Sequence, residues 1–172
     1  PKPMMSLEEA MLARRSIRRY KPIPLALAEL SAVLAWSAAG VVRPYPQLPG
    51  GYRVESCVVV REVEGLRAGV YMYDAQGHSL ASTLGGDLSR TLARACLGQE
   101  WVENAAANIV MYTPAPSAAA EVEAGMMGQC LYLAATSLRL GTVAVGAFYD
   151  DEVASILRLR GRPLYVFPLG KP

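Results

Sequence analysis

Histidine and cysteine are scarce in this chain. Its 172 residues include one histidine, His78, and three cysteines, Cys57, Cys96 and Cys130. A single histidine excludes a two-histidine metal site and a Ser-His-Asp triad built within one chain, and its setting predicts an exposed turn residue. The cysteines are odd in number, widely spaced and set in apolar runs, which favours buried thiols over disulfides. We therefore expect no metal site.

Charge and long apolar runs are also scarce. Only 19% of the residues are charged, and 17 Lys and Arg against 15 Asp and Glu leave a net charge of +2. Such a small charge gives no reason to expect nucleic-acid binding. The longest run free of charge and proline, Ala124 to Leu138, is shorter than the roughly 18 residues of a membrane span, and residues 1–6 do not resemble a secretory signal. We expect a cytoplasmic protein that binds neither nucleic acid nor a membrane.

Apolar residues are abundant instead. They make up 52% of the chain, more than a monomer with so few charges is expected to bury. A self-complementary dimer is the commonest way to cover such a surface. We therefore expect a homodimer, with residues 117–140, which are apolar nearly all round beyond Gly125, at or near its interface.

The length fits one domain spanning residues 1–172, and sequence patterns predict its elements. The expected helices cover residues 7–15, 25–39, 87–96, 101–107, 117–140 and 150–158, and the expected strands cover 55–61, 69–74, 108–113, 142–148 and 163–169. Residues 41–52 are rich in proline and predict a long loop. Because helices and strands do not alternate regularly, we expect an α+β fold with a mostly antiparallel central sheet flanked by helices.

Cations are concentrated near the N-terminus, at Arg14, Arg15, Arg18, Arg19 and Lys21. Guanidinium groups make bidentate, permanently charged contacts to phosphate oxygens, and Ser16 adds a hydroxyl donor among them. Two interpretations stay open here: an anion site, or an arginine-rich helix end that complements the helix dipole. If the segment is extended, Ser16 and Arg18 face one way and Arg19 faces the other.

The stretch from Ser6 to Tyr20, SLEEAMLARRSIRRY, resembles the opening helix and turn of the nitroreductase-like flavoproteins. The resemblance covers nearly the whole chain and continues in Val63-Glu64-Gly65-Leu66, Gly69-Val70-Tyr71, Tyr73-Asp74, Glu123-Ala124-Gly125, Gln129 and Pro168-Leu169-Gly170. It implies a dimeric nitroreductase-like fold, FMN as the cofactor, NADH or NADPH as an electron donor, and a small-molecule substrate. The Val-Glu-Gly-Leu and Gly-Val-Tyr-x-Tyr-Asp elements most resemble the azoline (thiazole/oxazole) dehydrogenase-type subset.

The resemblance also implies where the flavin binds. The R-R-S-x-R pattern of the family holds the flavin phosphate and ribityl chain, and backbone N–H groups at the positions of Gly146 and Ala147 lie near flavin N5 and O4. A strand end with small residues in a tight core is the other interpretation of that pair. No catalytic side chain is assigned. The implied cofactor-binding residues are Arg14, Arg15, Ser16, Arg18, Gly50, Gly51, Gln129, Gly146 and Ala147.

The chain departs from the family pattern at three places. The stretch from Pro44 to Tyr52 replaces the usual Pro-Ser-x-Gly element, Gln129-Cys130 replaces a Gln-Asn pair, and the sequence stops at Pro172 soon after its last expected strand. Two functions are therefore weighed. One is an FMN-dependent oxidoreductase that moves hydride or electrons between a reduced nicotinamide or organic substrate and an acceptor. The other is a non-catalytic or cofactor-poor relative that keeps the dimeric fold as a binding protein.

Overall fold

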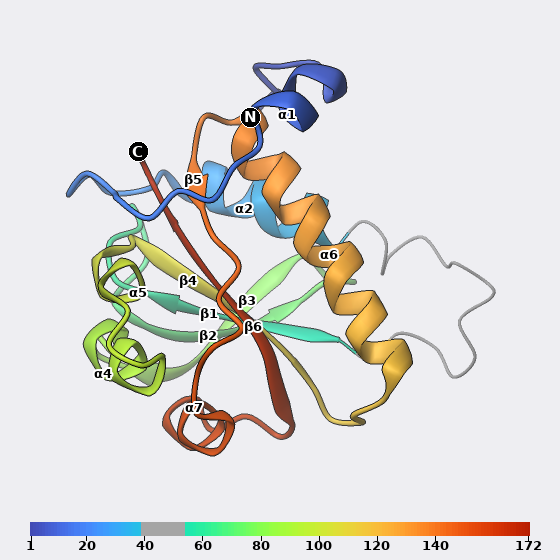
Figure 1. The fold of residues 1–172 in the computed structure, drawn as a ribbon. Coiled ribbons are helices and arrows are strands. Elements are labelled where there is room, and N and C mark those ends of the chain that lie inside the picture. Colours follow the sequence, from blue (N-terminus) through green and yellow to red (C-terminus); the bar gives the residue numbers. More distant parts are fainter. Residues whose placement is uncertain (39–53) are drawn as a thin grey trace.

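A computed structural model describes residues 1–38 and 54–172, in which one six-stranded sheet lies between two layers of helices (Figure 1). The sheet has the order β3-β2-β1-β4-β6-β5, and each neighbouring pair is antiparallel. This arrangement confirms the predicted α+β fold. The strands are β1 (Glu55–Val60), β2 (Gly69–Asp74), β3 (Ser79–Gly85), β4 (Ala107–Thr113), β5 (Gly141–Thr142) and β6 (Arg162–Gly170).

Six helices lie within the described residues: α1 (Leu7–Ala13), α2 (Leu27–Ser37), α4 (Ser89–Ala95), α5 (Glu100–Asn104), α6 (Ala118–Ser137) and α7 (Asp150–Leu157). Helices α2 and α6 cover one face of the sheet, with α1 lying against α6, and α4, α5 and α7 lie on the other face (Figure 1). None of these helices is both long enough and apolar enough to cross a membrane.

Two apolar cores result, one on each face of the sheet. Successive residues of a strand point to opposite faces, so Val58 of β1 joins the core under α2 and α6, whereas Val59 joins the core under α4, α5 and α7. Residues 57–60 are fully buried, as expected for a strand covered on both faces. Burial raises the pKa of Cys57 and of Cys96 to about 12, so both thiols are neutral, which agrees with the prediction of buried cysteines.

One predicted boundary is wrong, and one strand is missing from the prediction. The helix expected over residues 101–107 ends at Asn104, because Ala105 is extended and Ala107 already pairs in β4. Strand β3 was not predicted at all, since its sequence, SLASTLG, is small and polar and most of its residues are exposed. It lies at the edge of the sheet, where hydrogen bonds to β2, rather than burial, define it.

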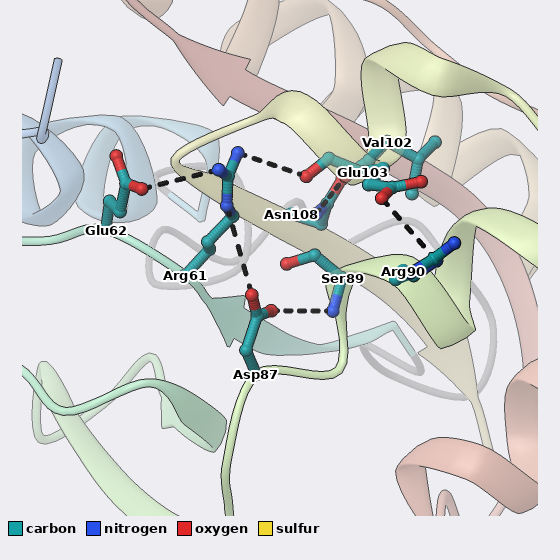
Figure 2. Close-up of polar contacts among 8 residues, drawn as sticks. All are labelled: Arg61, Glu62, Asp87, Ser89, Arg90, Val102, Glu103 and Asn108. Carbon is teal, nitrogen blue, oxygen red and sulfur yellow. Dashed lines mark hydrogen bonds and ion pairs between the residues drawn. The ribbon is translucent and has the colours of Figure 1, made fainter. Parts of the chain in front are cut away.

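Arg61, directly after β1, connects the sheet to the segment that carries α4 and α5 (Figure 2). Its guanidinium donates to the carbonyl of Glu103 at 3.3 Å, pairs with Glu62 at 3.4 Å and lies 3.9 Å from a carboxylate oxygen of Asp87. The buried side chain of Asn108 donates to a backbone carbonyl of α5 at 3.0 Å. These bonds fix the position of α5, whose first turn reaches the candidate site.

Candidate functional site

Residues 14–21 leave α1 and follow the β5–β6 edge of the sheet in a non-helical path. The N–H of Ile17 donates to the carbonyl of Thr142 at 2.9 Å, and the N–H of Lys21 donates to the carbonyl of Lys171 at 2.8 Å. Backbone hydrogen bonds therefore attach the segment to the sheet edge at its middle and at its C-terminal end, which leaves its side chains free for other contacts.

Two glycines let this segment approach the sheet edge closely. A Cβ added to Gly141 would lie 2.7 Å from Cγ2 of Ile17, and one added to Gly170 would lie 2.9 Å from Cδ1 of Tyr20. The hydroxyl of Tyr20 donates to the carbonyl of Ile17 at 2.8 Å. Burial raises the pKa of Tyr20, so the hydroxyl stays protonated and keeps this bond.

The arginines of this segment have no acidic partner within the described residues. No carboxylate there lies within ion-pair distance of Arg14, Arg15, Arg18 or Arg19, and residues 39–53 contain no Asp or Glu. Helix α1 ends at Ala13 with no basic residue in its last turn, which disfavours the helix-dipole interpretation. Four positive charges are therefore available to an anion.

Two of these arginines lie over aromatic rings. The guanidinium carbon of Arg14 is 5.0 Å from the ring centroid of Tyr132, and that of Arg18 is 5.5 Å from the ring centroid of Trp101. A ring below a guanidinium restricts its movement and leaves the N–H groups at its edge free to donate. Arg14 and Arg18 thus have different partners, on α6 and α5 respectively.

Tyr132 of α6 contacts both the arginine segment, residues 14–21, and the chain that follows β5. Its hydroxyl is hydrogen-bonded to Oγ of Ser16 at 3.0 Å and accepts the N–H of Ala144 at 2.7 Å. Its ring packs edge-on against Phe167, with centroids 5.9 Å apart. Sequence analysis did not identify Tyr132. The available signal was helical spacing, because Tyr132 follows the predicted Gln129 by three residues and so lies on the same side of α6.

The strand predicted over residues 142–148 is wrong beyond Thr142. After β5 only Val145 returns to the ladder, as an isolated bridge to Val166. On either side of Val145, side chains bond to the backbone: Tyr132 accepts the N–H of Ala144, and the side-chain amide of Gln99 donates to the carbonyl of Ala147 at 2.9 Å. Non-local side-chain contacts therefore replace the expected strand pairing.

This interruption leaves two adjacent backbone donors open. Gly146 and Ala147 are both exposed, and within the described residues their N–H groups donate no hydrogen bond. A Cβ on Gly146 would lie 3.6 Å from the Tyr165 ring, an ordinary contact, so the surrounding protein does not crowd this position. Exposure disfavours the tight-core interpretation of the pair. Adjacent open N–H groups can instead stabilise negative charge on a ligand.

A cavity of about 300 Å³ opens beside these donors. Its aromatic lining comes from Phe148 and Tyr165, next to Gly146. Its charged lining includes Arg162, which donates to a carboxylate oxygen of Glu121 at 2.6 Å. The cavity volume suits a small molecule or one ring system.

The other predicted cofactor-binding residues make none of the contacts described above or lie outside the residues that the structure describes. Gly50 and Gly51 fall outside the described residues. Gln129 is exposed on α6, and Arg15 is exposed after α1. Cys130, the departure next to Gln129, lines a different cavity under α1, and burial raises the pKa of its thiol.

His78 is exposed in the turn between β2 and β3, as predicted, and both of its ring nitrogens are hydrogen-bonded. Nε2 lies 2.8 Å from Oγ of Ser31, and Nδ1 lies 2.8 Å from the hydroxyl of Tyr73. The bond to Ser31 connects the turn to α2, and the bond to Tyr73 connects it to β2. Among the described residues, no group of three or more His, Cys, Asp or Glu side chains is placed to hold a metal ion.

Comparison with known proteins gives a consistent match. Residues 11–171 match the model of the nitroreductase family. A protein of Methanocaldococcus jannaschii described as "Putative nitroreductase" is 36% identical over 182 aligned positions, which cover 97% of this chain and 91% of that protein.

Solved structures with the same description share the fold. One from Anabaena variabilis has a TM-score of 0.84 at 31% identity, and the alignment covers 96% of this chain but only 38% of that longer chain. One from Ralstonia eutropha has a TM-score of 0.79 at 27% identity, covering 99% of this chain and 87% of that one. An NADPH:FMN oxidoreductase of Vibrio harveyi, solved with NAD+, has a TM-score of 0.68 at 22% identity, covering 96% and 68%, which is a likeness of fold alone.

Proposed function

Because this chain belongs to the nitroreductase family, whose members are oxidoreductases, we propose that it is an FMN-dependent oxidoreductase that takes hydride or electrons from NADH or NADPH and passes them to a small organic acceptor. One observation carries the proposal. Within the described residues, the arginine segment, whose guanidinium groups have no acidic partner there, is connected to the open N–H groups of Gly146 and Ala147 through Ser16, Tyr132 and Ala144.

The arginine end has the donors that a phosphate dianion requires. Arg14, Arg15 and Arg18 offer charged N–H groups, and Ser16 offers a hydroxyl among them. Charge-assisted hydrogen bonds of this kind are worth roughly 1.5–3 kcal/mol each when sheltered from water. Lys171 is 3.5 Å from a carboxylate oxygen of Glu29, so its charge is already engaged. We therefore assign the FMN phosphate to the N-terminal arginines.

The open N–H groups at the other end of this arrangement are suited to hydrogen bonds with the flavin ring. The N–H groups of Gly146 and Ala147 would donate to the ring edge that becomes electron-rich on reduction, and Gln129 would lie between the two ends on α6. Bound FMN would supply the hydride and electron chemistry, and the protein would hold and orient it. The adjacent cavity, with Phe148 and Tyr165, would receive the substrate. Gly50 and Gly51 stay predicted cofactor contacts.

A homodimer is part of the proposal. Helix α6 buries one side against the sheet and exposes Val122 (56%) and Met126 (40%), and α1 exposes Leu12 (90%) and Met11 (59%). Apolar side chains exposed on two touching helices are typical of a subunit interface. Light scattering at micromolar concentration should give twice the 18.5 kDa mass of one chain. A particle of one chain's mass would contradict the dimer.

Electron transfer is tested with FMN-loaded protein under anaerobic conditions. NADH or NADPH is expected to bleach the yellow colour, and a nitroaromatic acceptor is expected to restore it. Free FMN at the same concentration is the control, because it shows the reaction without the protein. Bound FMN that neither nicotinamide bleaches would contradict the proposed electron donor.

The same FMN-binding and bleaching experiments also test two alternative functions. Bleaching by a peptide that contains a thiazoline or oxazoline ring, without any nicotinamide, would place the chain in the azoline dehydrogenase-type subset. A colourless protein that takes up no added FMN would favour the non-catalytic relative, a binding protein with the same fold.

A further inference from the structure

The hydrogen bonds of Tyr132 have defined directions. The N–H of Ala144 can only donate, so the Tyr132 oxygen accepts in that bond. Between Tyr132 and Ser16 one hydroxyl donates to the other. The pair has two hydroxyl protons and this bond uses one, so one O–H is left to donate elsewhere. Both hydroxyls belong to neighbours of Arg14: the Tyr132 ring lies below the Arg14 guanidinium, and Ser16 follows Arg14 by two residues.

Tyr132 also holds residues that lie close to the two open donors. Ala144 is exposed and outside the strand ladder, and the Tyr132 hydroxyl is the acceptor for its N–H. Gly146 follows two residues later, a span of at most about 7 Å of chain. Directly before Gly146, Val145 exchanges two backbone hydrogen bonds with Val166, at 2.8 and 2.9 Å. The Gly146 and Ala147 N–H groups are therefore held by this bridge, by the Tyr132 bond to Ala144 before it, and by Gln99, bonded to the carbonyl of Ala147, after it.

We propose that Tyr132 is a positioning residue that sets the arginine segment and the Gly146–Ala147 donors at one fixed separation, so that a single flavin nucleotide engages both. The inference rests on the proposed function. Its physical basis is that one hydroxyl bonds both partners while the ring is fixed between Arg14 and Phe167. No other described side chain bonds to both Ser16 and Ala144.

Replacing Tyr132 with phenylalanine separates positioning from phosphate recognition. The ring and its packing remain, and the hydroxyl of Ser16, no longer bonded to Tyr132, can donate its proton to the phosphate. The N–H of Ala144 loses its acceptor, so the Gly146 and Ala147 donors are held only by the Val145–Val166 bridge before them and by Gln99 after them, and they are less well fixed. Tyr132→Phe should therefore weaken FMN and riboflavin by the same factor, about tenfold. The reduction potential of bound FMN should become more negative, because the N–H groups stabilise the reduced ring less well.

Tyr71→Phe is the matched control. The Tyr71 hydroxyl also bonds to backbone, donating to the carbonyl of Arg67 at 2.8 Å, but on β2, away from the candidate site. It should leave both flavin affinities and the potential unchanged. Binding of both flavins by Tyr132→Phe within about twofold of the original protein, or a loss confined to FMN, would overturn the proposal.

Hydrogen exchange of the unaltered, flavin-free protein tests the inference without any variant. The amide of Ala144 should be protected from exchange although it is exposed and unpaired in the sheet. Rapid exchange there would overturn the positioning role even if FMN binds. Protection there together with no FMN binding would contradict the proposed function and this inference with it, whereas FMN binding with rapid exchange would contradict the inference alone.

Discussion

Replacing Arg18 with alanine is expected to weaken FMN binding by about 10- to 100-fold and to leave riboflavin binding nearly unchanged. Riboflavin lacks the phosphate, so a guanidinium that binds only the phosphate contributes nothing to it. Arg18 has no acidic partner among the described residues, and its position over the Trp101 ring restricts its movement. Its charge is therefore available and its location is defined. Titration of each variant with both flavins measures the effect.

Arg19→Ala is the control for this experiment. Arg19 is the neighbouring arginine and is equally charged, but alternation along a non-helical segment directs it away from Arg18. It should change FMN affinity little. Equal losses for FMN and riboflavin in Arg18→Ala, or a larger loss in Arg19→Ala, would show that the phosphate lies elsewhere.

Replacing Gly141 with valine should lower the free energy of unfolding by about 1–3 kcal/mol and also weaken FMN binding. A Cβ at this position would lie 2.7 Å from Cγ2 of Ile17, 3.0 Å from its Cβ and 3.1 Å from a ring carbon of Tyr20. The clash forces residues 16–20 away from the sheet edge, and the arginines move with them. Urea unfolding measures the stability, and flavin titration measures the affinity.

Gly85→Ala is the matched control, since a Cβ there meets no atom within 4 Å. It should leave FMN affinity unchanged. If Gly141→Val loses stability but keeps its full FMN affinity, the docking of residues 16–20 on the sheet edge is not required for cofactor binding.

Short-range signals predicted most of the fold. Ser6 and Glu9 indicated a capping box, and both of its hydrogen bonds are present. The apolar run of residues 57–60 and the tyrosines of residues 69–74 indicated two neighbouring strands, which pair antiparallel with Val58 opposite Tyr71. These predictions succeed because capping, spacing and burial depend on residues close together in the chain.

The errors concern features that depend on distant residues. Strand β3 exists because β2 offers it a ladder, and the strand expected after Thr142 is lost because Tyr132 and Gln99 bond to its backbone. The roles of Tyr132 and Trp101 beside the arginines depend on contacts between segments far apart in the sequence. Helical spacing places Tyr132 on the same side of α6 as Gln129, but it does not indicate which distant residues contact it. The arginines could therefore be predicted from the sequence, whereas the rings beside them could not.

The most direct test of the account is a calorimetric titration of the flavin-free protein with FMN and, separately, with riboflavin. The account predicts one FMN per chain and riboflavin binding weaker by at least about 100-fold, because several charge-assisted bonds to the phosphate are lost together. No binding of FMN, or equal affinity for the two flavins, would contradict the claim that residues 14–18 form the phosphate site of a flavoenzyme.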